Sequence, residues 1–304
     1  MAIKHRGELT KALKKLRRHP PAIAGMCVLA VLYAVCLFAE FVAPYHFDNE
    51  SRTNSYNPPS RVRFVDARGR FHLVPFVYKT AYGFDEYYRR RYVEDTTTRY
   101  PVKLFVKGDE YRLLGLIPGD RHLFGVDPAA RLYLMGADSR GRDVFSRIVY
   151  GSRVSLTVGF VGVIISTFIG LLVGGLAGYY GRWVDNILMR MCEMVMLVPA
   201  FYLLLALRAA FPPELSSVTI YFLIVFILSF IGWASLARVI RGMVKSIRER
   251  EFVIAAQALG QKDLIIIFRH IIPQTFSFLI VSVTLSIPAY ILGESGLSLI
   301  GLGI

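Results

Sequence analysis

The chain has 304 residues, of which 54% are hydrophobic and 19% charged, and its mean hydropathy is +0.46. These proportions suit a lipid bilayer better than water. A net charge of +14 would be typical of a nucleic-acid-binding protein if the basic residues formed a stripe on a soluble face, but many of them flank long apolar stretches. Composition and charge therefore exclude an ordinary soluble domain and indicate an integral membrane protein.

Five apolar stretches are long enough to cross a membrane. A helix rises about 1.5 Å per residue, so crossing about 30 Å of hydrocarbon takes about 20 apolar residues. The stretches cover residues 22–43, 154–180, 194–211, 218–237 and 272–292. The first is too long and too poor in cleavage signals for a signal peptide, which favours an uncleaved anchor. We therefore predict an all-α membrane protein, a polytopic helical bundle with five visible spans.

Glycines and charges refine two of these spans. Gly170, Gly174 and Gly178 recur at four-residue spacing in the second span, which predicts close packing against another helix. Arg190 and Glu193 precede the third span at a spacing that permits an ion pair. We expect these two residues to remain at the membrane interface, with a substrate or ion site as the alternative.

Lysine and arginine in the short flanking segments predict the orientation, because cytoplasmic segments retain positive charge. Residues 1–21 are rich in basic side chains, which places the N-terminus in the cytoplasm. Counting across five spans places residues 238–271 there as well, and this segment is also basic. The same count places residues 44–150 outside the cytoplasm.

Residues 46–133 differ in composition and predict a small extracytoplasmic insert that contains β structure. Segments 61–65 and 71–78 flank one turn, and segments 102–106 and 111–117 flank a second turn at 107–109, so two hairpins are expected. Tyrosines and arginines between them form a composition that could stack with nucleic acid. Because an extracytoplasmic segment does not meet nucleic acid, a partner protein or the membrane surface is the preferred contact.

Residues 248–260 predict a short helix that ends at Gly260, since glycine can adopt the left-handed conformation that closes a helix. A second short helix is expected from about residue 262 to 271, before Pro273 opens the fifth span. Two short helices joined at a glycine and held between two membrane helices form a rigid projection. We expect this projection to transmit motion between proteins.

The same residues resemble the cytoplasmic loop of permease subunits in ATP-binding-cassette importers, which runs Glu-Ala-Ala, three residues, Gly, and ends in Leu-Pro. Ile254 stands where the glutamate is usual, and Ile272 replaces the leucine before the proline. The other family positions match at the family spacing. The resemblance implies an ATPase-coupling loop that includes Ala255, Ala256, Ala258, Leu259, Gly260, Asp263, Arg269 and Pro273.

Two further segments resemble the dipeptide and oligopeptide branch of this family. Residues 136–156 are similar to its Gly-Thr-Asp-x-x-Gly-Arg-Asp stretch, and residues 293–303 are similar to the sequence after its fifth helix. The family positions are Asp138, Gly141, Arg142, Asp143, Arg147 and Gly151 before the second span, and Glu294 and Gly296 after the fifth. The resemblance covers residues 1–45 and 135–304. Because the family has six helices, we expect a chain truncated at its C-terminus, with loss of the last helix as the alternative.

The resemblance also implies the domain organisation and the partners. A cytoplasmic segment at 1–21 and an anchor at 22–43 precede the insert at 44–150, and the core permease domain is expected at 151–304, with its coupling loop at 238–271. The expected function is translocation, most simply of peptides, by alternating access. The expected partners are a second homologous permease, two ATPase subunits, an extracytoplasmic substrate-binding protein and membrane lipid, without nucleic acid. ATP and Mg are expected on the partner subunits, because this sequence has no Gly-x-x-x-x-Gly-Lys-Ser/Thr loop.

Two other classes of protein are alternatives. A membrane-embedded enzyme needs polar catalytic groups that face one another, yet the histidines are scattered and the sequence has no Gly-x-Ser-x-Gly or His-Glu-x-x-His motif. We therefore expect no enzyme, no catalytic residue and no metal site. A receptor or anchor that acts through the insert would explain residues 46–133, but it would leave the coupling segment unexplained.

Overall fold

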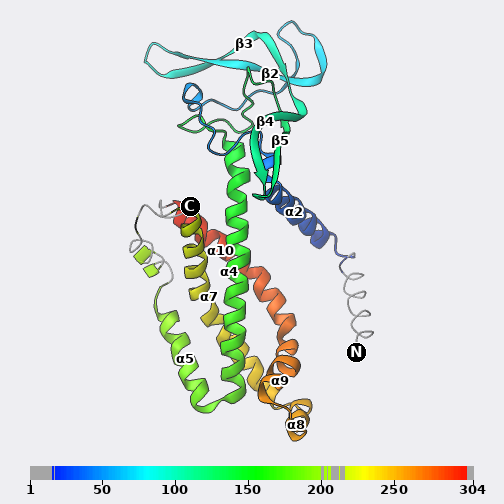
Figure 1. Ribbon diagram of the computed structural model, residues 1–304, viewed down its shortest axis with the longest axis vertical. Coiled ribbons are helices and arrows are strands. Elements are labelled where there is room, and N and C mark those ends of the chain that lie inside the picture. Colours follow the sequence, from blue (N-terminus) through cyan, green and yellow to red (C-terminus); the bar gives the residue numbers. More distant parts are fainter. Residues whose placement is uncertain are drawn as a thin grey trace. The chain divides into compact units, whose positions relative to one another are not determined.

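The computed structural model describes residues 16, 18–199, 202–203, 205–206, 212 and 216–299. The chain divides into two compact units, Met1–Arg153 and Val154–Ile304. Among the described residues, four helices are long and apolar enough to cross a membrane, and a smaller part of the chain forms strands (Figure 1). These findings confirm a polytopic helical protein with a small β region.

Parts of three sequence predictions lie outside the described residues. They are most of the basic segment at 1–21, residues 200–201, 204 and 207–211 of the predicted third span at 194–211, and residues 300–303 of the last family segment. The four candidate spans are Pro20–Leu37, Val144–Tyr180, Val218–Arg248 and Asp263–Leu299.

The first unit begins with helix α2 (Pro20–Leu37), which is followed by the short helix α3 (Ala39–Val42). Two prolines open α2, where the missing N–H groups would have no intrahelical partner. The sequence predicts one helix over 22–43, but the structure breaks it at Phe38. The side chain of Arg153 donates to the carbonyls of Cys36 and Leu37, at 3.1 and 3.0 Å, and so satisfies groups that the end of α2 leaves free.

Two small antiparallel sheets follow in the first unit, one with the strand order β1-β2-β3 and one formed by β4 and β5. A 3₁₀ turn, η1 (Arg52–Asn54), precedes the strands β1 (Arg63–Val65), β2 (Phe71–Phe84), β3 (Arg90–Pro101), β4 (Lys103–Leu113) and β5 (Ile117–Gly125). β1 and β2 pair around a turn that contains Gly69 at a φ of 77°, which confirms the first predicted hairpin. The core of this region includes buried Val77, Val126 and Leu132.

The second predicted hairpin is wrong in the position of its turn. Residues 107–109 lie inside β4, at a shift of its register with β5. A Cβ on Gly108 would lie 2.6 Å from the His122 ring, so this glycine permits a close contact within a bulged strand and does not mark a turn. The chain turns instead between Leu113 and Ile117, where Gly115 has a φ of 75°.

The tyrosine- and arginine-rich stretch at 82–92 forms the paired ends of β2 and β3 and the turn between them. Arg90 lies over the ring of Tyr82, at 4.8 Å from the ring centroid. The Tyr92 hydroxyl donates to the Ser55 carbonyl at 2.5 Å. Three of the side chains that could stack with a ligand, those of Tyr82, Arg90 and Tyr92, therefore make contacts within the first unit itself.

Helix α4 (Val144–Tyr180) begins in the first unit and continues into the second, which also contains α5 (Arg182–Leu197), α7 (Ser217–Arg248) and α10 (Phe276–Leu299). The predicted glycine stripe packs α4 against α7. A Cβ on Gly174 would lie 2.5 Å from the Ala237 carbonyl oxygen, and one on Gly178 would lie 2.7 Å from that of Arg241. Only glycine lets the two backbones approach this closely.

Helix α7 does not end near residue 237, where the predicted span stops, but continues to Arg248. Its last turns bury Ile240, Val244 and Ile247, so packing extends the helix beyond the apolar stretch. Arg241 pairs with the buried carboxylate of Asp185 on α5, with 2.7 Å between Nε and Oδ1. This pair neutralises a buried charge between two helices, where an unpaired charge would be costly.

The remaining predicted features of the helices are present with shifted ends. The ion pair between Arg190 and Glu193 on α5 measures 2.8 Å. The fifth predicted span, 272–292, begins with a 3₁₀ turn, η3 (Ile272–Thr275). It continues as α10, which contains Pro288 and extends beyond the predicted end to Leu299.

Candidate functional site

The predicted coupling residues form a compact projection in the second unit. It consists of α8 (Glu251–Ala258), a turn at Gly260, α9 (Asp263–Ile265) and the π-helical turn η2 (Ile266–Ile271). Figure 1 shows α8 and α9 together beyond the end of α7. Gly260 has a φ of 73°, the left-handed conformation predicted for the residue that closes the first helix. We call residues 251–271 the α8–η2 projection.

One side of the α8–η2 projection is buried against α7. Val253 and Ala256 of α8 pack in the same cluster as residues 266, 267 and 271 of η2 and the buried isoleucines and valine at the end of α7. Fully burying an aliphatic side chain of this size contributes about 1.5–3 kcal/mol. The projection is therefore held as a packed extension of the membrane helix, not as a free loop.

Tyr179, near the end of α4, fastens the projection at a second point. Its hydroxyl donates to the Asp263 carboxylate at 2.8 Å and accepts a hydrogen bond from the Gln257 amide at 3.2 Å. Arg248, the last residue of α7, donates to the Tyr179 carbonyl at 2.7 Å. The tyrosine ring itself is buried in the same apolar cluster. One side chain thus links α4, α8 and α9.

The opposite side of the α8–η2 projection is apolar and exposed. Leu259 is 80% exposed, and Ile254 is 52% exposed. The alanine pair of the family motif divides between the two sides, since Ala256 is buried whereas Ala255 is exposed. Ile254, which stands in place of the family glutamate, therefore adds apolar surface to the outer face. We define this outer face as the exposed residues Ile254, Ala255, Ala258, Leu259, Leu264 and Phe268.

The other predicted coupling residues have separate places in the projection. Asp263 is engaged with Tyr179. Arg269 is exposed on η2, and Pro273 lies in the turn η3 that leads into α10. Gly260 is also exposed, and a Cβ at this position would meet nothing within 4 Å.

The motif before the second span forms a turn that starts α4. The Asp138 carboxylate accepts hydrogen bonds from the backbone N–H groups of Arg140 and Arg142, from Arg142 Nε at 2.8 Å and from Arg147 Nη1 at 2.7 Å. Gly141 has a φ of 75°, and its Cβ would lie 1.9 Å from the Ser51 carbonyl oxygen. The contacts among the motif residues from 138 to 147 therefore hold the turn that starts α4.

Asp143 caps the first turn of α4. Its Oδ2 accepts from the Ser146 N–H at 2.7 Å and from the Ser146 hydroxyl at 2.6 Å. Burial raises the pKa of Asp143 above its usual value, although these hydrogen bonds oppose the shift. For Asp138, burial acts in the same direction, but the hydrogen bonds from Arg142 outweigh it and lower the pKa. Gly151 lies further along α4, away from this turn, and a Cβ there would meet nothing within 4 Å.

Glu294 lies buried in α10, with 4% of its surface exposed. Its carboxylate accepts hydrogen bonds from the Ser155 hydroxyl of α4 at 2.9 Å and from the Ser298 hydroxyl at 2.7 Å. These bonds satisfy a polar group that would be costly to bury alone. Gly296 has open space around it, so the structure gives it no close contact.

A cleft of about 300 Å³ lies between α4, α7 and α10 within the second unit. Hydroxyl groups line much of it, from Ser166 and Thr167 on α4, Ser235 on α7, and Ser282, Ser286 and Tyr290 on α10. Gly232 makes room for the Tyr290 hydroxyl, since a Cβ there would lie 2.0 Å from it. The cleft therefore places several hydroxyl groups among side chains that are otherwise mostly apolar.

Three of these features were not among the sequence predictions, namely the Tyr179 link, the pair of Asp185 and Arg241, and the hydroxyl-lined cleft. A carboxylate and an arginine beside neighbouring spans could have indicated the pair, because unpaired charges are rare at such depth. Tyr179 stands at the end of an apolar stretch and carries no such signal. Its partners lie 78 and 84 residues further along the chain.

Two family models match the chain. The model of the binding-protein-dependent transport system inner membrane component matches residues 170–304, and the model of the N-terminal transmembrane domain of oligopeptide transport permease C matches residues 9–59. The first match includes the whole α8–η2 projection and the cleft residues on α7 and α10. Residues 60–169, which include all the strands of the described part of the chain, lie outside both matches.

Curated relatives agree with these matches. The chain is 38% identical over 177 residues to the dipeptide transport system permease protein DppC of Bacillus subtilis, covering 58% of this chain and 53% of that protein. It is 31% identical over 195 residues to the oligopeptide transport system permease protein OppC of the same organism, covering 64% and 60%. A putative peptide permease protein of Brucella ovis is 35% identical over 207 residues, covering 67% and 63%.

The matched part thus spans about half to three fifths of the length of these relatives. The two family models and the relatives agree on one class of membrane protein, as does the set of apolar helices. Residues 170–304 of the chain belong to the family of binding-protein-dependent transport system inner membrane components, and the relatives that the chain resembles are dipeptide and oligopeptide permeases.

Proposed function

We propose that the chain is a permease subunit of an ATP-binding-cassette importer that carries peptides across the inner membrane. The observation that carries the proposal is the α8–η2 projection, which has a buried inner side shared with α7 and an exposed apolar outer face. An exposed apolar surface on a rigid support is typical of a protein contact. The family and the names of the relatives support a transport role for this contact.

The outer face of the projection docks onto an ATPase subunit in this proposal. ATP and Mg bind that subunit, which supplies the phosphate chemistry, and this chain binds neither. Closure of two ATPases moves the projection, and the packed core that it shares with α7 passes the movement to the membrane helices. The replacement of the family glutamate by Ile254 makes the contact more apolar and less dependent on charge.

The proposed assembly pairs this chain with a second, homologous permease around the transport pathway. The pathway then includes the hydroxyl-lined cleft of α4, α7 and α10, whose serines can hydrogen-bond a peptide backbone inside an apolar bundle. An extracytoplasmic binding protein delivers the peptide. In this arrangement the coupling segment and the N-terminus lie in the cytoplasm, and the insert at 44–150 lies outside, as the distribution of positive charge suggests. The chain then has five spans, of which the third in chain order covers residues 194–211.

Leu259→Glu tests the docking face. Leu259 is 80% exposed, so the substitution should leave the fold intact while it places a charge in the proposed contact. We expect membranes that carry the variant to lose most of the retained ATPase and most ATP-dependent peptide uptake. Leu116→Glu is the matched control, because Leu116 is 82% exposed in the turn between β4 and β5. Equal ATPase retention by both variants would refute the proposed docking face.

A further inference from the structure

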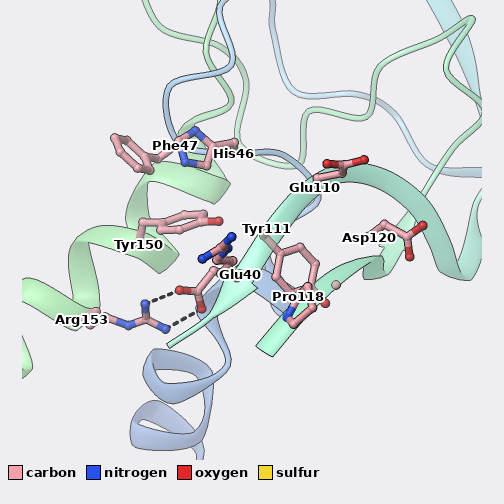
Figure 2. Close-up of a pocket in the computed structure, with 11 residues that line it drawn as sticks. Glu40, His46, Phe47, Glu110, Tyr111, Pro118, Asp120, Tyr150 and Arg153 are labelled. Carbon is pink, nitrogen blue, oxygen red and sulfur yellow. Dashed lines mark hydrogen bonds and ion pairs between the residues drawn. The ribbon is translucent and has the colours of Figure 1, made fainter. Parts of the chain in front are cut away.

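A cavity in the first unit lies outside the features already discussed. It has a volume of about 890 Å³ and opens between two walls (Figure 2). Residues of α3, the following loop and the start of α4 form one wall, and the β4–β5 hairpin forms the other. A volume of this size is typical of sites for small ligands. We call it the hairpin cavity; its lining includes Glu40, Phe47, Glu110, Tyr111, Asp120 and Tyr150.

The ion pair of Glu40 and Arg153 closes one side of the hairpin cavity and is itself fully engaged. Arg153 contacts both carboxylate oxygens of Glu40, at 2.5 and 2.6 Å (Figure 2). The same guanidinium also donates to two carbonyls at the end of α2. Each charge is therefore neutralised by the other, and this pair serves to hold the wall in place.

The carboxylates on the hairpin wall have less support. Glu110 is exposed and has no hydrogen-bond or ion-pair partner among the described residues. Asp120 lies beside Lys107 at 3.3 Å, but the lysine side chain is 81% exposed, so this surface pair is weak. Arg112 is the only other charged lining residue on the described hairpin. The hairpin wall thus carries two carboxylates beside one guanidinium, and Glu110 is the carboxylate that no described residue pairs.

The opposite wall is aromatic and carries an unsatisfied hydroxyl. The rings of His46, Phe47 and Tyr150 form a cluster, with 5.2 Å between the centroids of Phe47 and Tyr150. Figure 2 shows the Tyr150 ring directed from α4 towards the hairpin. The Tyr150 hydroxyl oxygen is buried and has no hydrogen-bond partner within the described part of the chain. Because this oxygen has no accessible surface, the wall offers the cavity the faces of its aromatic rings and not the hydroxyl.

Gly119 and Tyr111 shape the hairpin wall between these groups. A Cβ on Gly119 would lie 2.9 Å from the Tyr111 ring, so the glycine lets the ring lie flat across the neighbouring strand. The Tyr111 hydroxyl donates to the Arg121 carbonyl at 2.7 Å, which fixes the ring in this position. Burial raises the pKa of Tyr111, and the nearby charge of Asp120 adds to this shift. The second wall is therefore preformed as well.

We propose that the hairpin cavity binds a short peptide through its free N-terminal ammonium group. Glu110 receives the ammonium group, and Asp120 adds to the negative field. The aromatic wall covers an apolar side chain, and aromatic faces also favour a nearby cation. The proposal deepens the proposed function and rests on it for the choice of a peptide, while the geometry alone requires only an ammonium group with an apolar body.

Binding of two dipeptides to the full chain in lipid nanodiscs tests the inference directly. The probes are Ala-Phe and N-acetyl-Ala-Phe, which differ only in the ammonium group, and calorimetry measures their affinities. We expect acetylation to weaken binding by at least about tenfold, because it removes a charge-assisted hydrogen bond. Equal affinities, or no binding of either dipeptide, would overturn the proposal.

Substitutions then locate the binding site. Glu110→Gln should weaken binding of Ala-Phe by about tenfold or more, and Asp120→Asn by less, because its charge is partly offset by Lys107. Tyr150→Ala should weaken the binding of both dipeptides alike, since the aromatic wall covers an apolar side chain that both contain. Glu86→Gln is the matched control, as Glu86 is an exposed carboxylate on the other hairpin. If Glu110→Gln binds Ala-Phe as the control does, the site is not at the hairpin cavity.

A transport assay separates this inference from the proposed function. If Ala-Phe does not bind the hairpin cavity but the assembled importer still takes up peptides with ATP, only the cavity assignment fails. If uptake itself is absent from an importer that retains its ATPase, the proposed function fails. If Ala-Phe binds the unchanged chain and Glu110→Gln abolishes that binding, the assignment of the ligand to the hairpin cavity is supported in either case.

Discussion

Tyr179→Phe removes one oxygen atom from the point where α4, α8 and α9 meet, and its effect can be worked out from the structure. The hydroxyl makes two hydrogen bonds, one to the Asp263 carboxylate at 2.8 Å and one from the Gln257 amide at 3.2 Å. A neutral hydrogen bond contributes about 1 kcal/mol, and one to a charged group contributes more. Asp263 and Gln257 are exposed, so water replaces part of the loss. We therefore expect a net loss of about 1–2 kcal/mol.

The loss should be local to the α8–η2 projection. The phenylalanine ring keeps its place in the apolar cluster, and the hydrogen bond from Arg248 remains because it uses the Tyr179 carbonyl. A loss of about 1–2 kcal/mol raises the opening equilibrium of the projection about 5- to 30-fold. Hydrogen exchange of residues 251–265 should accelerate by that factor in nanodiscs, while exchange in the middle of α7 stays unchanged.

Tyr180→Phe is the matched control. Tyr180 is the next residue, is 41% exposed, and makes no hydrogen bond through its hydroxyl within the described residues. In the assembled importer, Tyr179→Phe should also raise the amount of ATP hydrolysed per peptide transported, because a loosened projection passes on less of the movement. Unchanged exchange in residues 251–265, or equal effects of the two substitutions, would refute the assignment of Tyr179 as an anchor.

Three further predictions concern the turn before α4 and the cleft. Gly141→Ala should lower the free energy of unfolding by at least about 2 kcal/mol, since its Cβ would lie 1.9 Å from the Ser51 carbonyl oxygen. Gly151→Ala, in the helix that follows, is the control and should be neutral or stabilising by up to about 1 kcal/mol. Equal melting temperatures of the two variants would contradict this expectation. The pKa of Asp138 is lowered in the folded chain, so its charge contributes stability above the unfolded pKa of about 3.9, and this stability is lost as the pH falls through the folded pKa. Asp138→Asn should therefore flatten the decline of the melting temperature below about pH 4, and an unchanged decline would show that the carboxylate is not the cause. Gly232→Ala should slow peptide uptake without faster exchange in the projection, because a Cβ would lie 2.0 Å from the tyrosine hydroxyl in the cleft.

The features that the sequence predicted are those with a local physical cause. Apolar length identifies the spans, because about 20 residues are needed whatever the neighbours are. Gly260 and Gly69 mark turns through their own backbone conformation, and both have a positive φ in the structure. The glycine stripe on the second span is also local, since three small residues on one face permit close packing with any partner helix.

The features that the sequence did not predict depend on distant partners. Gly108 has the composition of a turn, but the ring of His122 explains it, and this partner is known only once β4 and β5 pair. The end of α7 lies beyond its apolar stretch because Asp185 neutralises Arg241 and because η2 covers the last buried turn. The match to the family indicated which residues belong to the projection, but not that Ala256 is buried while Ala255 is exposed.

The length of α7 connects the proposed coupling at the α8–η2 projection to the membrane-spanning part of the chain. A single helix runs from residue 217 to 248, and the apolar cluster that it shares with the α8–η2 projection packs the two together across the short turn at Glu249 and Arg250. Close-packed cores resist compression, and the glycine contacts between α4 and α7 leave no gap to absorb a displacement. A push on the outer face must therefore move α7 together with α4. Because α4 and α7 both line the hydroxyl-lined cleft, the same displacement reshapes the surface that we propose for the peptide.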